Sequence, residues 1–147
     1  MTGVEIDFVV PDSLEALRVY ESIFQVVRVE VTAYPRGQNE AVFTIYGTRI
    51  HMLDENPDFQ LIAPKPGDPK PMWLNITVPD IRETFDKALK ASCRVIQEPI
   101  EMEELGIVNA IVQDPFGYMW LLHEIKREVS FEERLRIMEE KMGLKPE

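Results

Sequence analysis

Hydrophobic and polar residues alternate at the start of the chain. The apolar positions of residues 4–10 share one face of an extended segment: Ile6, Phe8 and Val10. Glu5 and Asp7 fall on the other face. Alternation of this kind predicts a half-buried strand. Its acidic face should be hydrated or paired, because carboxylates are rarely buried without a partner.

The spacing of apolar residues then becomes helical. Asp12 occupies an N-cap position and Glu15 follows three residues later, which is the pattern of a capping box. The next apolar residues fall on one helix face: Leu14, Leu17, Tyr20 and Phe24. Three strands are predicted after this helix, at residues 26–34, 41–46 and 48–53.

A proline-rich segment interrupts the pattern. Five prolines lie between Pro57 and Pro71. Proline lacks the N–H that a central strand or a helix interior requires, so we expect residues 55–71 to form an extended linker. The linker divides a single domain of residues 1–147 into a first module of about residues 1–54 and a second of about 72–125.

The second module repeats the pattern of the first. Strands are predicted at residues 73–78, 93–96, 107–113 and 118–124, with an acidic loop at 99–106 and a helix after Asp80. Val10-Pro11-Asp12 recurs as Val78-Pro79-Asp80 at the same point of each module, and Gly47 and Gly117 occupy corresponding turns. The predicted fold class is α+β, with two tandem βαβββ modules.

The turn before the last strand is the sharpest local signal. Asp114-Pro115-Phe116-Gly117 has the residues that a tight turn requires. In the strand that follows, alternate side chains face opposite ways. One face carries Met119, Leu121 and His123, and the other carries Tyr118, Trp120 and Leu122. We expect the first face to bind ligand and Tyr118 and Trp120 to lie in the core.

A C-terminal helix is predicted at residues 130–143. Ser130 and Glu133 have capping-box spacing. The apolar residues lie on one face: Phe131, Leu135, Met138 and Met142. This face could pack on its own subunit or across a dimer.

Composition and charge exclude several classes of protein. With 16 basic and 26 acidic residues the net charge is −10, and no basic stripe suggests a nucleic-acid partner. No apolar run has membrane-spanning length, and the N-terminus lacks the pattern of a signal peptide. A single cysteine, Cys93, is typical of a reducing compartment. We expect a cytoplasmic protein with no membrane partner.

The duplicated modules, the helix-capping aspartates and the Asp114–Gly117 turn resemble the vicinal oxygen chelate superfamily, which includes glyoxalases, dioxygenases and bleomycin-resistance proteins. The turn, Trp120, His123 and the tail from Ser130 to Glu133 are similar to its PhnB-like branch. The resemblance implies that the modules form a curved mixed or antiparallel sheet cup that encloses a pocket. It also implies a homodimer.

The resemblance further implies four metal-ligand positions. Carried over to this chain, they fall on Glu5, His51, Trp73 and Leu121. Trp73 and Leu121 have no donor atom for a metal, which argues against glyoxalase I activity and for a site without metal or cofactor. Weak binding of a divalent ion through an atypical set of ligands stays open.

The expected function is binding of a small molecule. The candidate pocket residues are Glu5, Asp7, His51, Trp73, Asn75, Leu121 and His123. Aromatic and apolar groups in place of ligands favour a flat or aromatic molecule. One alternative is an enzyme, a lyase, isomerase or transferase, that uses Glu5 and His51 with or without a divalent metal. A second alternative is a dimeric interaction module.

Overall fold

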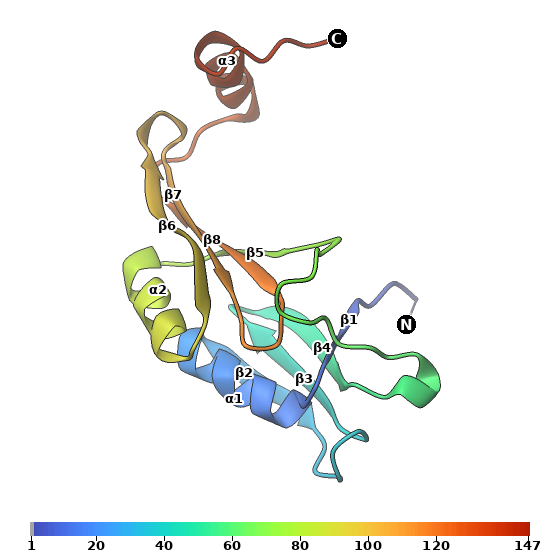
Figure 1. The fold of residues 1–147 in the computed structure, drawn as a ribbon. Coiled ribbons are helices and arrows are strands. Elements are labelled where there is room, and N and C mark those ends of the chain that lie inside the picture. The colour runs from blue at the N-terminus through green and yellow to red at the C-terminus, as the bar shows by residue number, and fades with distance from the viewer. Residues whose placement is uncertain (1) are drawn as a thin grey trace.

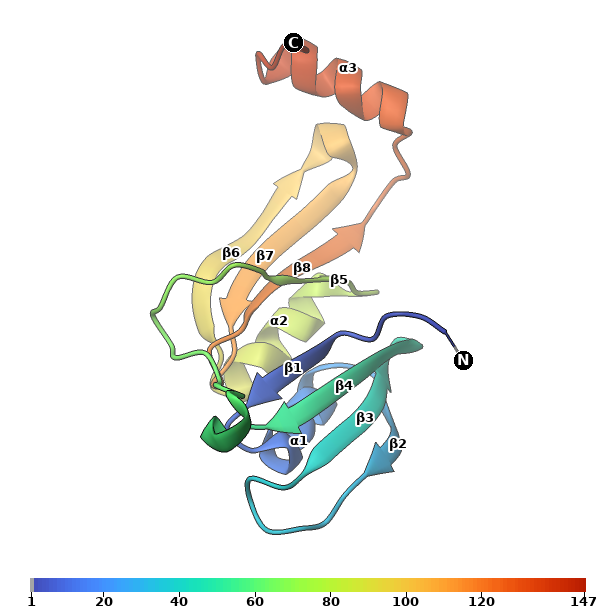
Figure 2. The same cartoon turned by 90° about the vertical axis from the view of Figure 1, so that its right-hand side faces the viewer.

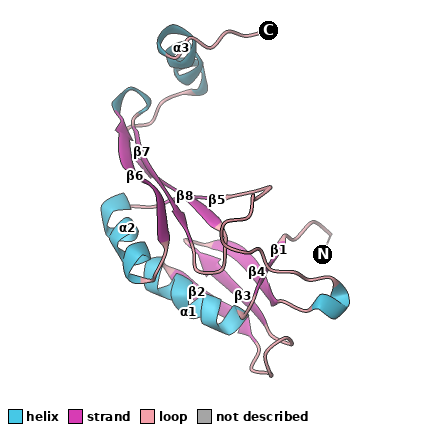
Figure 3. Ribbon diagram, in the orientation of Figure 1, coloured by secondary structure: helices cyan, strands magenta, loops and turns pink. Residues whose placement is uncertain are grey.

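The computed structural model describes residues 2–147 and consists of two four-stranded mixed sheets and three α-helices (Figure 1). The first half contains β1 (Asp7–Val10), α1 (Ser13–Ile23), β2 (Val26–Val31), β3 (Glu40–Ile45) and β4 (Thr48–Asp54). The second half contains β5 (Leu74–Thr77), α2 (Ile81–Lys90), β6 (Arg94–Met102), β7 (Ile107–Gln113), β8 (Met119–Ile125) and finally α3 (Phe131–Lys141). Figure 3 shows the same succession by type of element. The predicted α+β fold of tandem βαβββ modules with a C-terminal helix is confirmed.

The two sheets have the same topology. Their strand orders are β1-β4-β3-β2 and β5-β8-β7-β6 (Figure 2). In each sheet the first strand of the module runs parallel to the last strand, and the other pairs are antiparallel. The repeat seen in the sequence is therefore a repeat of structure.

The helix starts lie where the polar caps predict them. The Asp12 carboxylate accepts hydrogen bonds from the Leu14 and Glu15 amides, both at 3.0 Å. Asp80 accepts from the Glu83 amide at 3.0 Å. The Ser130 hydroxyl accepts from the Glu133 amide at 3.1 Å. Each cap satisfies amide groups that have no partner inside the first helical turn.

The two modules share one hydrophobic core, formed where α1 and α2 meet the strands. Trp120 is 4% exposed, and its ring centroid lies 5.3 Å from that of Tyr20 and 4.9 Å from that of Phe24, both in the first module. The Tyr118 hydroxyl donates to the Val9 carbonyl at 2.8 Å. Trp120 and Tyr118 are core residues, as predicted, and they join the second module to the first.

The predicted turn is built around a buried carboxylate. Asp114 accepts hydrogen bonds from the Phe116 and Tyr118 amides at 2.9 Å, from the Tyr20 hydroxyl at 2.6 Å and from the Trp120 indole at 2.8 Å. Burial raises the pKa of Asp114 above its ordinary value, and the hydrogen bonds from Tyr20 and Trp120 offset part of that rise. The Asp114 carboxylate therefore ties the turn to both modules.

Gly117 closes this turn with φ of +96°, which is costly for residues with a side chain. The linker also passes close by. A Cβ on Gly117 would lie 3.0 Å from the Pro64 carbonyl oxygen. Glycine is required here both by the backbone conformation and by the path of the linker.

Three predicted strands are shorter in the structure. The strand predicted at 73–78 loses one residue at each end, and the first two strands of the chain lose three residues each. The first begins at Asp7 and not at residue 4, and Ile6 is 74% exposed. Its pairing with β4 starts only at Asp7, opposite His51, so the preceding residues have no partner strand. The second strand ends at Val31 and not at Tyr34, because the Asn39 side chain accepts from the Tyr34 amide at 2.7 Å and turns the chain.

One predicted strand is much longer in the structure. β6 continues to Met102, where the sequence pattern placed a loop from Pro99 to Gly106. Proline is tolerated here because β6 is an edge strand whose register shifts between Gln97 and Ile100. The acidic residues after it form a short 3₁₀ turn, Glu103–Leu105.

The C-terminal helix stands away from the rest of the chain (Figure 1). None of its residues is buried, and Phe131 is 60% exposed. Lys141 forms an ion pair with Glu104 at 2.7 Å, at the tip of the β6–β7 hairpin. The apolar face of α3 therefore does not pack on the core of its own subunit. No helix among residues 2–147 is long and apolar enough to cross a membrane.

Candidate functional site

Each sheet has one face on its helix and one face free of it, which we call the open face. Phe8, Val10 and Met52 are buried under α1, so their neighbours in β1 and β4 point to the open face. In the second sheet Trp120 and Leu122 are buried, and Leu121 and His123 point to the open face. The candidate residues on the strands all lie on these open faces.

Three carboxylates surround His51 on the open face of the first sheet. Asp7 lies opposite His51 in the parallel β1–β4 pair. The Nδ1 atom of His51 is 2.8 Å from Glu5 Oε1 and 3.0 Å from Asp7 Oδ1. The Nε2 atom is 3.1 Å from Glu40 Oε2, on β3. Sequence reasoning identified Glu5, Asp7 and His51, but it missed Glu40, whose position depends on the β3–β4 register.

Glu5, Asp7 and His51 fit a divalent cation by the chemistry of their donors. Their potential ligand atoms all lie within 4.8 Å of one another. Two carboxylates and one imidazole are a donor set that first-row divalent metals accept. The three side chains are open to solvent to different extents, with His51 the most covered. This arrangement could hold a metal or could move a proton between His51 and a carboxylate.

The second sheet lacks these donors at the matching place. Asn75 lies opposite Leu121 in the parallel β5–β8 pair, just as Asp7 lies opposite His51 in the first sheet. Leu121 has no donor atom, and neither does Trp73, which immediately precedes β5. The four positions implied by the family resemblance therefore supply only two metal ligands, Glu5 and His51.

Asn75 and His123 instead line a cavity of about 790 Å³, which we call the His123 cavity. Its floor is the open face of the second sheet, with Thr77 and Ile107 among the lining residues. Its far wall is formed by the chain leading into α3, with Ser130, and by the first turn of that helix, with Arg134. A volume of this size is typical of sites for small organic ligands. No sequence signal linked the C-terminal helix to this cavity, because its position is set by tertiary structure alone.

His123 has a pKa below its ordinary value, because burial disfavours the charged imidazolium. A neutral imidazole has one donor and one acceptor nitrogen. Together with the Asn75 amide and the Thr77 hydroxyl, it provides hydrogen-bonding groups in a wall that also contains Ile107 and Ile125. Charged side chains line the other end of the cavity, next to α3. The part of the cavity on the open face of the sheet is thus suited to an apolar molecule with a few polar atoms.

Trp73 lies apart from both groups. It lines a second cavity, of about 450 Å³, between the linker and the start of β8. Six of the seven predicted residues therefore occupy three separate places in the chain. Glu5, Asp7 and His51 form one cluster, Asn75 and His123 share a cavity, and Trp73 lines another, while Leu121 lies half-buried on the open face.

Cys93 does not belong to any of these places. Its thiol is buried, and burial raises its pKa to about 12. A thiol in this state is a poor nucleophile, which agrees with a structural role.

Residues 4–122 match the family described as the Glyoxalase/Bleomycin resistance protein/Dioxygenase superfamily. An uncharacterized protein of Mycobacterium bovis is 29% identical over 129 residues, which cover 85% of this chain and 84% of that protein. Among solved structures, the fosfomycin resistance protein FosX of Mesorhizobium loti aligns with a TM-score of 0.63 and 16% identity, covering 92% of this chain and 98% of that chain. FosX of Listeria monocytogenes, complexed with Mn(II) and a sulfate ion, aligns with a TM-score of 0.62 and 14% identity over 92% of this chain and 98% of that chain.

Proposed function

Because the chain belongs to the glyoxalase/bleomycin resistance protein/dioxygenase superfamily, we propose that it is a small-molecule-binding protein of the PhnB-like kind whose ligand occupies the His123 cavity. The observation that supports this most strongly is a cavity of about 790 Å³ with both apolar and hydrogen-bonding groups in its wall. The binding site needs no metal, since Asn75, Thr77 and His123 supply its polar contacts. The ligand is a flat or aromatic molecule with one or two polar atoms.

A thermal-shift screen with uncharged aromatic compounds tests this proposal. A ligand present at about 100 times its dissociation constant stabilises the native state by about 2.7 kcal/mol. For a chain of this length the melting temperature should then rise by about 5–10 °C.

The two histidines of the chain provide a matched pair of variants. His123→Leu should reduce the shift by more than half, because it removes a polar contact inside the cavity. His51→Leu should leave the shift unchanged. If no compound stabilises the wild type more than His123→Leu, the proposal is wrong.

We infer a second candidate function from the cluster around His51, namely an enzyme of the lyase, isomerase or transferase type. Held by Glu5, Asp7 and His51, a divalent cation would supply Lewis-acid polarisation of a substrate oxygen. Without a metal, His51 and Glu5 could transfer a proton, since the Nδ1 and Oε1 atoms are 2.8 Å apart. The Mn(II) bound by a FosX of the same fold supports the first version.

Metal analysis separates this candidate from the first. We expect protein purified without chelator to contain less than about 0.1 equivalent of divalent metal. The reason is that only one module supplies donors, and His51 Nδ1 already contacts two carboxylates. Mass spectrometry with an inductively coupled plasma measures the content. Near-stoichiometric metal that disappears in Asp7→Asn would support the metalloenzyme and contradict our expectation.

We also propose a homodimer that forms through the apolar face of α3. The exposure of Phe131 and Leu135 supports it, because a helix face of this kind is stabilised by burial against another surface. Light scattering should give about 34 kDa, twice the 17.0 kDa of one chain. Replacing Phe131 and Leu135 by serine should weaken the dimer at least about tenfold. Glu139→Ser on the same helix is the control, and a wild-type mass of one chain would exclude the dimer.

A cytoplasmic location remains a proposal as well. It is supported by the single Cys93, which cannot form a disulfide within the chain.

A further inference from the structure

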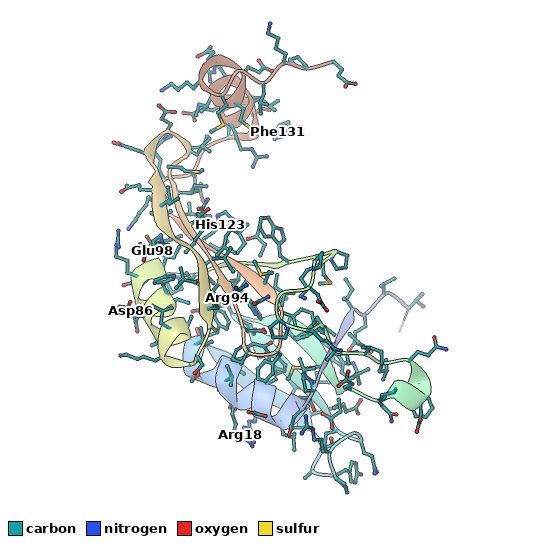
Figure 4. All side chains as sticks on the ribbon, in the orientation of Figure 1. Arg18, Asp86, Arg94, Glu98, His123 and Phe131 are labelled. Atoms are coloured by element: carbon teal, nitrogen blue, oxygen red, sulfur yellow. The ribbon has the colours of Figure 1, made fainter. Side chains whose placement is uncertain are left out.

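A second cavity, of about 450 Å³, lies at the other end of the second sheet from the His123 cavity, and we call it the Trp73 cavity. Lys70 of the linker and Trp73, just before β5, form one side, and Arg94, Gln113 and Met119 on three adjacent strands form the other. The two cavities share no lining residue. Met119 and His123 are four residues apart on β8, a distance of about 13 Å along a strand. Figure 4 shows Arg94 and His123 at different heights along this sheet.

Gln113 is the most unusual residue of the Trp73 cavity. It is only 5% exposed, and it lies between Arg94 and Met119 on the central of the three strands. No side-chain polar atom in the described chain is both sealed from solvent and unpaired. Gln113 lines the cavity, so its side chain is placed to contact a ligand there. An amide has two N–H donors and one acceptor oxygen, which can replace water in bonding to a polar ligand.

The charge in this cavity is opposite to that of the whole protein. The chain has a net charge of −10, but Arg94 has no ion-pair partner among residues 2–147. Lys70 is also without a carboxylate, and its ammonium donates to the backbone carbonyls of Lys65 and Asp68. Those two bonds hold the ammonium in place and leave its third hydrogen free. The cavity wall therefore contains two cations, Arg94 and Lys70, and one acid, Asp68. This balance of charge favours an anionic ligand.

The rest of the wall is apolar and aromatic. Trp73 is 51% exposed, so one face of its indole is available to a flat molecule. Ile96 and Met119 lie on the strands beside it. We propose that the Trp73 cavity binds a small aromatic carboxylate, with the carboxylate on Arg94 and Lys70, the Gln113 amide donating to it and the ring on Trp73. This site is separate from the His123 cavity, and neither depends on the other.

Calorimetric titration with 2-naphthoate tests this site. We expect a dissociation constant of about 0.1–1 mM at low salt, which is ordinary for a ligand of this size. Acetate, which lacks the ring, should not bind measurably. 2-Naphthalenemethanol lacks the charge and gains no affinity from Arg94, so its binding should be the same in Arg94→Gln as in the wild type. Raising the salt to about 0.5 M should weaken the binding, because part of the attraction is between exposed charges. The fluorescence of Trp73 should also change on binding, whereas Trp120 is buried in the core.

Variants identify the residues that bind the probe. Arg94→Gln should weaken 2-naphthoate at least tenfold, and Gln113→Leu about fivefold. Arg18→Gln is the matched control, because Arg18 is an exposed arginine on α1 outside both cavities (Figure 4). It should change the affinity less than twofold. The proposal is overturned if the wild type does not bind 2-naphthoate, if Arg94→Gln weakens 2-naphthalenemethanol as much as 2-naphthoate, or if Arg94→Gln behaves like Arg18→Gln.

Discussion

Replacing Asp114 by alanine should lower the free energy of unfolding by about 4 kcal/mol, which for this chain is a fall of about 10 °C in melting temperature. The change removes the acceptor of four hydrogen bonds at once, two from turn amides and two from Tyr20 and Trp120. All of these donors are in buried surroundings, so water cannot replace the carboxylate at full strength. Chemical denaturation followed by circular dichroism measures the loss.

Two further variants make the result for Asp114 specific. Tyr20→Phe keeps the aromatic packing and removes only one of the four bonds, so it should cost about 1.5 kcal/mol and remain measurable if Asp114→Ala does not fold. Asp86→Ala removes an exposed carboxylate on α2 and should change stability by less than about 0.5 kcal/mol. If Asp114→Ala is no more destabilising than Asp86→Ala, the buried carboxylate does not hold the modules together.

Asp54 should have the second large effect. It is buried at the end of β4, and its carboxylate accepts from the Ser13 amide and hydroxyl at 2.7 and 2.6 Å, from the Gly37 amide at 2.8 Å and from the Asn39 amide at 3.0 Å. Asp54→Asn replaces one acceptor oxygen by a donor group, so we expect a loss of about 3 kcal/mol at pH 7. Asp58→Asn, an exposed aspartate four residues further on, is the matched control and should be nearly neutral.

The effect of Asp54 should depend on pH. Burial alone would raise the pKa of Asp54, but the hydrogen bonds from Ser13, Asn39 and Gly37 together lower it below its ordinary value. The native state therefore binds the Asp54 proton less readily than the unfolded state, whose pKa is about 3.9. The stability from Asp54 is present above about pH 4 and is lost as the pH falls through the native pKa.

The difference in unfolding free energy between wild type and Asp54→Asn should accordingly shrink below about pH 4. Asp114 has a raised pKa, so its contribution to stability changes with pH in the opposite direction. Both proteins contain Asp114, so this contribution cancels in the difference between them. Urea denaturation at several pH values between 2.5 and 7 measures this. A difference that stays constant, or grows, toward acid pH would contradict the hydrogen-bonding role of the carboxylate.

The fold could be predicted from local signals in the sequence. Asp12, Asp80 and Ser130 are caps whose side chains bond within their own helical turn, so four residues of sequence are enough to place each helix start. The alternation of side-chain directions along a strand likewise predicted which residues of β8 face the core, because it depends only on the pleat of that one strand. The limits of β1 and β6 could not be predicted in this way. The start of β1 depends on where its pairing with β4 begins, and the end of β6 depends on an edge position that tolerates Pro99.

The candidate site was less predictable, because it depends on tertiary structure. Sequence reasoning could place Glu5, Asp7 and His51 on one face but not in contact, since contact requires the register that puts Asp7 opposite His51. Arg94 and Gln113 gave no signal at all. Their cavity exists because the linker crosses the end of the sheet, and the contact of Pro64 with the turn at Gly117 is not visible in local sequence.

The most direct test of the central claim is to locate a ligand on the protein in solution. A compound from the thermal-shift screen can be titrated into labelled protein while proton–nitrogen NMR follows each backbone amide. We predict that the largest shifts occur at Asn75, Thr77, Ile107 and His123, the strand residues of the His123 cavity. Shifts centred on Glu5, Asp7 and His51, or on none of these residues, would contradict the proposed site.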